Sequence, residues 1–530
     1  MLLDILIING SVIDGTGKLR YQADVGIVEG RIELVGKAEN LNSTKVIDAS
    51  GLIISPGFID MHTHSDLTLL DDPGGDSKIH QGVTTEVVGN CGYSPFPVGP
   101  DGHGILNRSP NENFDWNWRD LDGWASQLES QGVSMNVAPQ LGHGSIRKAA
   151  RLTEDRCPSR DELKTMRSLV EESIEQGAFS MSTGLTGAPG MYADTDEIVA
   201  LAEVMSGYDN AFYVTHARVW GGNHIGAIQE AMDIGFRAQV PVQFSHMAII
   251  DPRAYGDGEQ MIDVIEKARS DGLDATYDVY PYTAAGSGLA QSLPSWLQVG
   301  GDQEMLRIMR TKEGRKRALL DMTKGHFRGL PWDFDSVVIA QVGSKTSENL
   351  IGKSVEEIAK DRKADPIETY LDLVDEEDNK IGAVFHNRVE SDVVYFLTHE
   401  LAMIGSDGNA ISPVGAYSRD KPHPRFYGTH PRILGRYVRE KSYLSLECAI
   451  QKMTNMPATR LGLKNRGTIE RNYMADLVVF DPDKIVDTAT FDDPHNLAEG
   501  ISYVIVGGEI VVSKGKHTNA KPGRVLRRGE

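Results

Sequence analysis

Eight short apolar runs, rich in β-branched residues, recur through the middle of the chain and alternate with stretches of helical periodicity. This alternation predicts repeated strand–helix units, which build a parallel sheet. Eight such units are the number that closes a (β/α)8 barrel, so we predict an α/β protein with a TIM barrel. The predicted strands cover residues 57–64, 83–91, 134–141, 178–184, 211–218, 240–246, 274–280 and 402–407.

The two ends of the chain have a different pattern. Residues 1–56 contain short strands joined by turns such as Asn9-Gly10 and Glu29-Gly30, and similar strands return near the C-terminus. We therefore predict a small β-sandwich domain built from both termini, residues 1–56 together with 455–530. The barrel then spans 57–454, and the long gap between its last two strands predicts an insertion near 285–345.

The charge balance limits the partners of the protein. With 75 acidic and 54 basic residues the formal charge is −21, which disfavours nucleic acid and anionic membranes and favours a small-molecule substrate. The N-terminus lacks a basic segment, and no apolar run approaches about 18 residues, so we expect neither a signal peptide nor a membrane span. Three scattered cysteines fit a reducing, cytoplasmic location. The oligomeric state stays open.

Residue types that bind metals stand at the ends of five predicted strands. In (β/α)8 barrels the C-terminal ends of the strands form the active-site mouth, and imidazole, thiolate and carboxylate groups are ligands of Zn²⁺. Taken singly, each residue has a structural alternative: a small buried cysteine, a hydrogen-bonded core histidine or a turn aspartate. Their joint occurrence at one edge predicts a metal site. The candidates are His62 and His64, which project from one strand face, and Cys91, His216, His246 and Asp407.

Longer motifs surround these residues, among them PGFIDMHTHSD, GVTTEVVGNCGYSP, FYVTHAR, VPVQFSHM, TYDVYPYTAAGSGL, MIGSDG and HPRFYGTHPRILGRYVRE. With these motifs the chain resembles the metal-dependent amidohydrolase superfamily and, within it, the D-aminoacylase family of N-acyl-D-amino-acid deacylases. The resemblance runs from near residue 1 to about residue 510. The resemblance to this family is specific. Most of the superfamily bridges its metals with a carboxylated lysine, whereas the D-aminoacylase family uses a cysteine, which Cys91 resembles in the present chain.

The resemblance implies a distorted barrel beside a small β domain, and an enzyme that hydrolyses linear amides. It implies one firmly held Zn²⁺ on Cys91, His216 and His246, and a second, weaker site on His62, His64 and Asp407. Zinc lowers the pKa of bound water from about 15.7 towards about 7, which supplies hydroxide at neutral pH. Asp407 would act as general acid/base, taking a proton from the water and returning it to the departing amine. The implied products are a carboxylate and a free D-amino acid.

The chain departs from the family pattern at one position. The family places a lysine two residues after the sixth-strand histidine, where it is thought to hold the substrate carboxylate, and here that position is Ala248. Losing such a contact typically costs about 1.5 to 3 kcal/mol of binding. The candidates that we expect to line the substrate site instead are Tyr192, Tyr282, Ser287 and Arg218, with Arg253 as a further cation.

Two alternatives remain beside the deacylase hypothesis. Ala248 also fits an amidase for neutral N-acyl amides that lack a free carboxylate. The second alternative is a non-catalytic scaffold with the same fold. Such relatives typically lose metal ligands, whereas this chain has a candidate ligand or base at all six positions.

Overall fold

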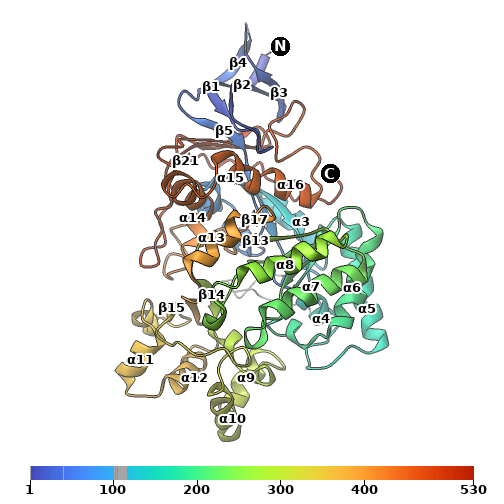
Figure 1. Ribbon diagram of the computed structural model, residues 1–530, viewed down its shortest axis with the longest axis vertical. Coiled ribbons are helices and arrows are strands. Elements are labelled where there is room, and N and C mark those ends of the chain that lie inside the picture. The colour runs from blue at the N-terminus through green and yellow to red at the C-terminus, as the bar shows by residue number, and fades with distance from the viewer. Residues whose placement is uncertain (1, 40, 101, 103, 105–115) are drawn as a thin grey trace.

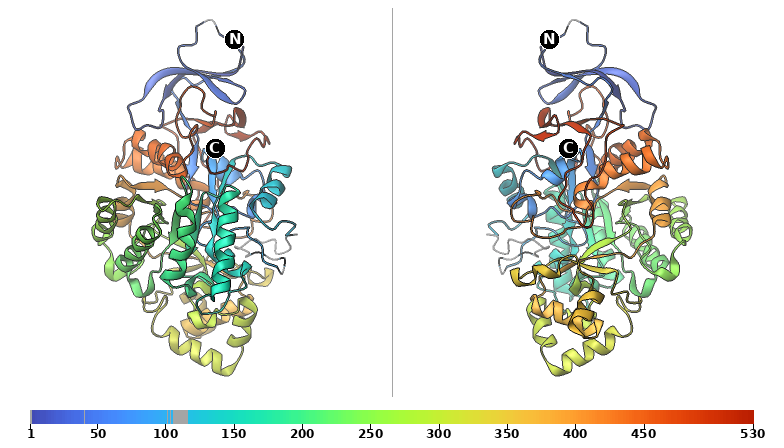
Figure 2. Two further views of the ribbon diagram at one scale, coloured as in Figure 1. Left: turned by 90° about the vertical axis from the view of Figure 1, so that its right-hand side faces the viewer. Right: turned by 90° about the vertical axis from the view of Figure 1, so that its left-hand side faces the viewer.

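The computed structural model describes residues 2–39, 41–100, 102, 104 and 116–530. Figure 1 shows three parts along the long axis: a β-rich part that contains the N-terminal strands, a central barrel and a helical segment at the opposite end. Both side views in Figure 2 show the same order. The barrel therefore lies between a terminal sheet and an inserted segment.

The barrel consists of parallel strands at all eight predicted places. The α/β fold and the TIM-barrel-like architecture are thus confirmed. The strands are β6 (Phe58–Asp60), β7 (Val83–Val88), β8 (Asn136–Pro139) continued by β9 (Leu141–Gly142), β10 (Ser180–Gly184), β11 (Phe212–His216), β12 (Val242–Phe244), β13 (Ala275–Val279) and β17 (Ala402–Ile404). Their pairing follows chain order, in one three-stranded and one six-stranded sheet.

The barrel closes irregularly. The third strand is divided: β8 pairs with β7, whereas β9 pairs with β10. The last strand meets the first through the Met61 amide, which donates to the Ile404 carbonyl at 3.0 Å, and through a bridge between Thr63 and Gly408. These two irregular joints separate the two barrel sheets.

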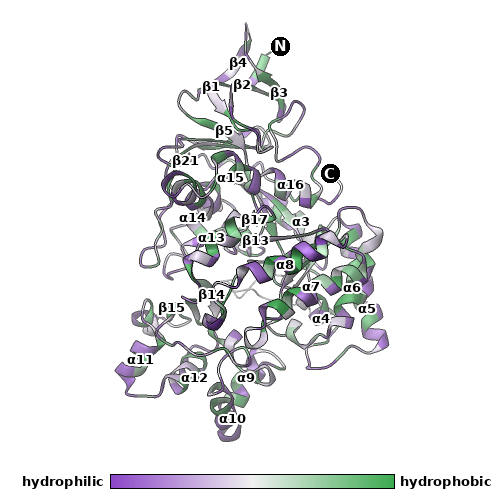
Figure 3. Ribbon diagram, in the orientation of Figure 1, coloured by the Kyte–Doolittle hydropathy of each residue, from purple (hydrophilic) through white to green (hydrophobic). Residues whose placement is uncertain are grey.

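Helices surround the barrel and pack on it through apolar residues. In Figure 3, helices such as α5 and α7 carry both hydrophobic and hydrophilic segments, as expected where one face is buried. Helix α5 begins with a capping box formed by Ser159 and Glu162. The helices are α1 (Thr68–Asp71), α2 (Asp76–Ile79), α3 (Leu121–Gln131), α4 (His143–Ala149), α5 (Arg160–Glu175), α6 (Thr195–Ala202), α7 (His224–Ala238), α8 (Gly258–Ser270), α13 (Glu390–Thr398), α14 (Arg425–Arg432), α15 (Leu446–Met453) and α16 (Asn455–Leu461).

Strands from both ends of the chain share one nine-stranded sheet. Ile53 of one strand lies opposite Phe480 of another, and this antiparallel pair joins the N-terminal and C-terminal strands. The strands are β1 (Leu2–Val12), β2 (Tyr21–Val28), β3 (Arg31–Gly36), β4 (Asn42–Asp48), β5 (Ile53–Pro56), β18 (Leu477–Phe480), β19 (Ile501–Val506), β20 (Glu509–Ser513) and β21 (Lys516–His517). The sandwich arrangement and the domain boundaries stay predictions.

The segment between β13 and β17 has its own core. A three-stranded sheet and four helices enclose buried residues that include Leu297, Tyr370 and Phe385. Its elements are β14 (Ala285–Gly288), α9 (Asp302–Met309), α10 (Lys312–Met322), β15 (Val337–Gln341), α11 (Val355–Arg362), α12 (Pro366–Glu376) and β16 (Gly382–Phe385). Because β14 pairs with the distant β16, the inserted sheet continues past residue 345, beyond the stretch predicted from the sequence.

A membrane-spanning helix would need both length and an apolar surface. Within the described residues, no helix combines the two to the degree required to cross a bilayer.

Candidate metal centre

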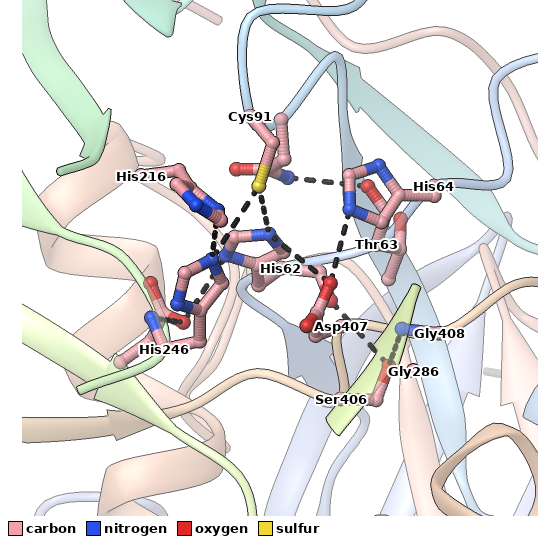
Figure 4. A network of polar contacts seen from close by, with 12 residues as sticks. His62, Thr63, His64, Cys91, His216, His246, Gly286, Ser406, Asp407 and Gly408 are labelled. Atoms are coloured by element: carbon pink, nitrogen blue, oxygen red, sulfur yellow. Dashed lines mark hydrogen bonds and ion pairs between the residues drawn. The ribbon is translucent and has the colours of Figure 1, made fainter. Parts of the chain in front are cut away.

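The six residues proposed as metal ligands or catalytic base come together at the C-terminal ends of the barrel strands. They form two groups that share Cys91: one adds His62, His64 and Asp407, and the other adds His216 and His246. Figure 4 shows the Cys91 sulfur between the two groups. A thiolate in that position can bridge two metal ions.

The distances within the cluster are short. Cys91 Sγ lies 3.5 Å from His246 Nε2, and His246 Nε2 lies 2.9 Å from His216 Nδ1. In the other group Cys91 Sγ lies 3.3 Å from His62 Nε2, and His64 Nε2 lies 3.0 Å from Asp407 Oδ1. All candidate donor atoms within each group lie within 4.8 Å of one another.

This donor set fits zinc. Bonds of about 2.0 to 2.3 Å in tetrahedral geometry separate neighbouring ligand atoms by about 3.3 to 3.8 Å, close to the spacings found here. Burial raises the pKa of the Cys91 thiol, but the His62 and His246 imidazoles outweigh burial and lower that pKa well below its usual range. Cys91 is therefore disposed to the thiolate form in which cysteine binds metals.

Three of these residues have left-handed backbone conformations. The φ angle is 53° at Cys91, 35° at His246 and 52° at Asp407. Residues other than glycine rarely adopt such angles, and they concentrate at functional sites because the strain has to be compensated by the surrounding structure. The backbone thus supports a functional assignment of these strand ends.

Two residues that the sequence analysis did not single out orient the histidines. Asp278, at the end of β13, places Oδ1 3.2 Å from His62 Nδ1 and accepts the His246 amide at 2.8 Å. Thr186 Oγ1 lies 2.6 Å from His216 Nε2. Groups that bond to the second nitrogen of a histidine fix which nitrogen faces a metal. Asp278 lies in a predicted strand, so its position near the strand end was the available signal.

Asp407 is held by a cation as well as by histidine. Arg425, at the start of α14, pairs with Asp407 Oδ2 at 2.9 Å, and its side chain is almost fully buried. Burial raises the pKa of Asp407, but Arg425 and the hydrogen bond with His64 together hold this pKa well below its usual range. Asp407 is therefore held in its ionised form.

The four residues proposed to contact substrate have partners of their own within the protein. Arg218 donates to the carbonyls of Met191 and Ala193 and pairs with Glu230. The Tyr192 hydroxyl donates to the Ser295 carbonyl at 3.0 Å. The Tyr282 hydroxyl donates to the Pro424 carbonyl at 3.4 Å. These contacts give each residue a structural role, and the roles in substrate binding stay predictions.

Ser287 connects to the cluster indirectly. Its hydroxyl donates to the side chain of Gln291, and Gln291 Nε2 donates to Thr186 Oγ1 at 3.2 Å. Because Thr186 contacts His216, this chain of hydrogen bonds joins the inserted segment to the candidate metal ligands.

A barrel whose strand ends carry this donor set defines a metal-dependent hydrolase of the amidohydrolase type. The family described as "Amidohydrolase family" matches residues 45–307 and 397–512, and the chain belongs to it. The unmatched stretch between them falls within the segment that separates β13 from β17.

Among known proteins, the chain is similar to deacylases of D-amino-acid derivatives. It is 32% identical to the D-aminoacylase of Alcaligenes xylosoxydans xylosoxydans, over 99% of this chain and 98% of that protein. It is 34% identical to the N-acyl-D-aspartate deacylase of the same organism, over 99% and 95%. The crystal structure of N-acyl-D-glutamate deacylase from Bordetella bronchiseptica, complexed with zinc and a phosphonate inhibitor, superposes with a TM-score of 0.83 at 30% identity, covering 99% of this chain and all of that one.

These comparisons confirm the resemblance to the D-aminoacylase family. The protein is therefore a metal-dependent amide hydrolase.

Proposed function

We propose that the protein is a zinc-dependent deacylase that hydrolyses small N-acyl-D-amino acids to a carboxylate and a free D-amino acid. The observation that carries the proposal is the position of Cys91 Sγ, 3.3 Å from His62 Nε2 and 3.5 Å from His246 Nε2. This spacing supports one zinc on Cys91, His216 and His246 and a second, weaker site on His62, His64 and Asp407. The names of the related deacylases support the substrate class.

Cys91, His216 and His246 would hold the zinc, which would supply Lewis-acid chemistry that polarises the amide carbonyl and acidifies water near neutral pH. Asp407 acts as the proton carrier. Its ionised carboxylate accepts a proton from the attacking water and delivers that proton to the amide nitrogen, because an amine is too basic to depart unprotonated. Arg425 and His64 hold the Asp407 carboxylate in one orientation during these transfers.

A second candidate is an amidase for neutral N-acyl amides. Ala248 favours it, because the uncharged side chain lies two residues after His246, where the family resemblance implies a lysine for the substrate carboxylate. This candidate uses the same metal centre and the same role for Asp407, and it differs only in the group that the substrate carries beside the amide.

The test is amine release by the zinc-loaded protein from N-acetyl-D-leucine, N-acetyl-L-leucine and N-acetyl-D-leucinamide. We expect a higher kcat/KM for the D acid than for the other two. Turnover of the neutral amide alone would replace the deacylase with the second candidate. A protein without stoichiometric zinc and without turnover would instead be a scaffold.

A further inference from the structure

An aromatic side chain beside the metal centre lies against two arginines. Tyr280 directly follows β13, at the strand end that also carries the metal ligands, and its side chain is fully buried. The Arg388 guanidinium lies 4.4 Å from the centre of the Tyr280 ring, and the Arg425 guanidinium lies 4.8 Å from it. Arg425 in turn pairs with Asp407 at 2.9 Å. The Tyr280 ring thus contacts both Arg388 and Arg425, and Arg425 is the residue that pairs with Asp407, the proposed proton carrier.

Several polar atoms in this cluster lack an acceptor. Among the described residues, no acceptor receives a hydrogen bond from the buried Tyr280 hydroxyl, Arg388 Nε or Arg425 Nε, and the side chain that faces the Tyr280 hydroxyl is itself a donor, Arg388. Buried polar atoms are nearly always satisfied, because an unmade hydrogen bond is costly. Three such atoms in one small neighbourhood indicate a site that receives the polar group of a ligand.

The two arginines differ in whether a carboxylate neutralises their charge. Asp407 neutralises Arg425, whereas none of the described carboxylates forms an ion pair with Arg388. Arg388 follows β16, the inserted strand that pairs with β14. The carbonyl of Gly286, a residue of β14 that is labelled in Figure 4, accepts a hydrogen bond from Arg425 at 3.5 Å. The inserted sheet therefore brings an uncompensated cation to the mouth of the metal centre.

The other arginines considered for this role are already occupied. Arg218 pairs with Glu230 and donates to two carbonyls. Arg253 forms a bidentate pair with Asp251. Arg388 alone among these three keeps donors without a carboxylate partner in the described part of the chain.

We propose that Arg388, together with the Tyr280 hydroxyl, binds the free carboxylate of the substrate. A carboxylate attached two bonds from the scissile nitrogen has to lie close to the group that protonates this nitrogen. The planar guanidinium donates two parallel hydrogen bonds to a carboxylate, which gives both affinity and orientation. This assignment rests on the proposed deacylase function and explains how an acid is recognised although residue 248 is alanine.

The test compares an acid with its neutral counterpart in the full-length, zinc-loaded protein. For wild type, Arg388→Gln and Arg388→Lys, kcat/KM is measured with N-acetyl-D-leucine and with N-acetyl-D-leucinamide. We expect Arg388→Gln to lower kcat/KM for the acid tenfold to a hundredfold, mainly through KM, and to leave the amide within about twofold. Arg388→Lys keeps the positive charge but cannot donate two parallel hydrogen bonds, so we expect its kcat/KM for the acid to lie between those of wild type and Arg388→Gln.

Each outcome has a distinct meaning. Arg436→Gln is the matched control, because it removes an arginine that already pairs with a carboxylate, Glu390, two residues along the chain from Arg388; we expect it to keep the preference for the acid. If Arg388→Gln keeps the preference for the acid, the assignment of Arg388 is wrong. The assignment is also wrong if kcat/KM falls equally for the acid and the amide while zinc content and melting temperature are unchanged. If Arg388→Gln does not fold, an Arg388→Lys variant that prefers the acid as strongly as wild type overturns it. If wild type itself does not prefer the acid, the deacylase proposal fails first, and the wild-type measurement alone reveals this.

Discussion

His62 Nδ1 lies 3.2 Å from Oδ1 of Asp278 at the base of the metal cluster, and both side chains are completely enclosed. The contact leaves His62 Nε2 facing Cys91 Sγ at 3.3 Å. A carboxylate on one imidazole nitrogen increases the basicity of the other, so this pair prepares His62 as a metal ligand.

Replacing Asp278 should therefore weaken metal binding without removing a ligand. For Asp278→Asn we expect a tenfold to hundredfold loss of affinity at the site that contains His62, measured by titration with zinc against a competing chelator. Asp274→Asn is the control, because Asp274 is exposed and pairs with Arg460. Equal affinities in the two variants would contradict a supporting role for Asp278.

The contact of Thr186 with His216 tests the other group. Thr186→Val removes the hydroxyl that lies 2.6 Å from His216 Nε2 while it keeps the shape of the side chain. We expect zinc affinity at the Cys91, His216 and His246 group to fall about tenfold to a hundredfold. Thr186→Ser retains a hydroxyl and should bind zinc nearly as wild type does. If the Val and Ser variants bind zinc equally well, the hydroxyl has no orienting role.

Asp407→Asn separates catalysis from the tight metal site. The amide cannot carry the proton, so we expect kcat to fall by about 10² to 10⁴, whereas the group formed by Cys91, His216 and His246 should still hold about one zinc per chain. Metal analysis and amine release on the same sample provide the measurement. Near-normal turnover in this variant would exclude Asp407 as the proton carrier.

His326 gives the inserted segment a dependence on pH. Burial lowers its pKa to about 4, and its ring packs 4.8 Å from that of Trp332. Because the folded form binds a proton less readily than the unfolded chain, stability is complete above the ordinary pKa and falls as pH decreases from about 6.5 towards 4, by up to about 3 kcal/mol. Urea unfolding at pH 7 and pH 5 should show this loss in wild type and a smaller one in His326→Asn. Equal losses in both proteins would assign the pH dependence to other groups.

The eight barrel strands could be predicted because buried parallel strands are short, continuous apolar runs. The candidate ligands Cys91, His216 and His246 could be picked out because they stand where such runs end, and the structure brings them together. No periodic pattern in the sequence identifies three further residues of the site. Two of them, Thr186 and Arg388, lie in connecting segments, and Arg425 lies at the start of a helix. Their roles depend on the approach of residues that are distant in sequence, such as Arg425 and Asp407. The pairing of β14 with β16 in the inserted segment likewise joins residues that are distant in sequence.

The most direct test of the account is X-ray absorption at the zinc edge, which measures the atoms bound to the metal in the native protein. We expect one sulfur at about 2.3 Å together with nitrogen or oxygen at about 2.0 to 2.2 Å, and loss of the sulfur in Cys91→Ser. A zinc shell of nitrogen and oxygen alone in the wild-type protein would contradict a cysteine-centred site.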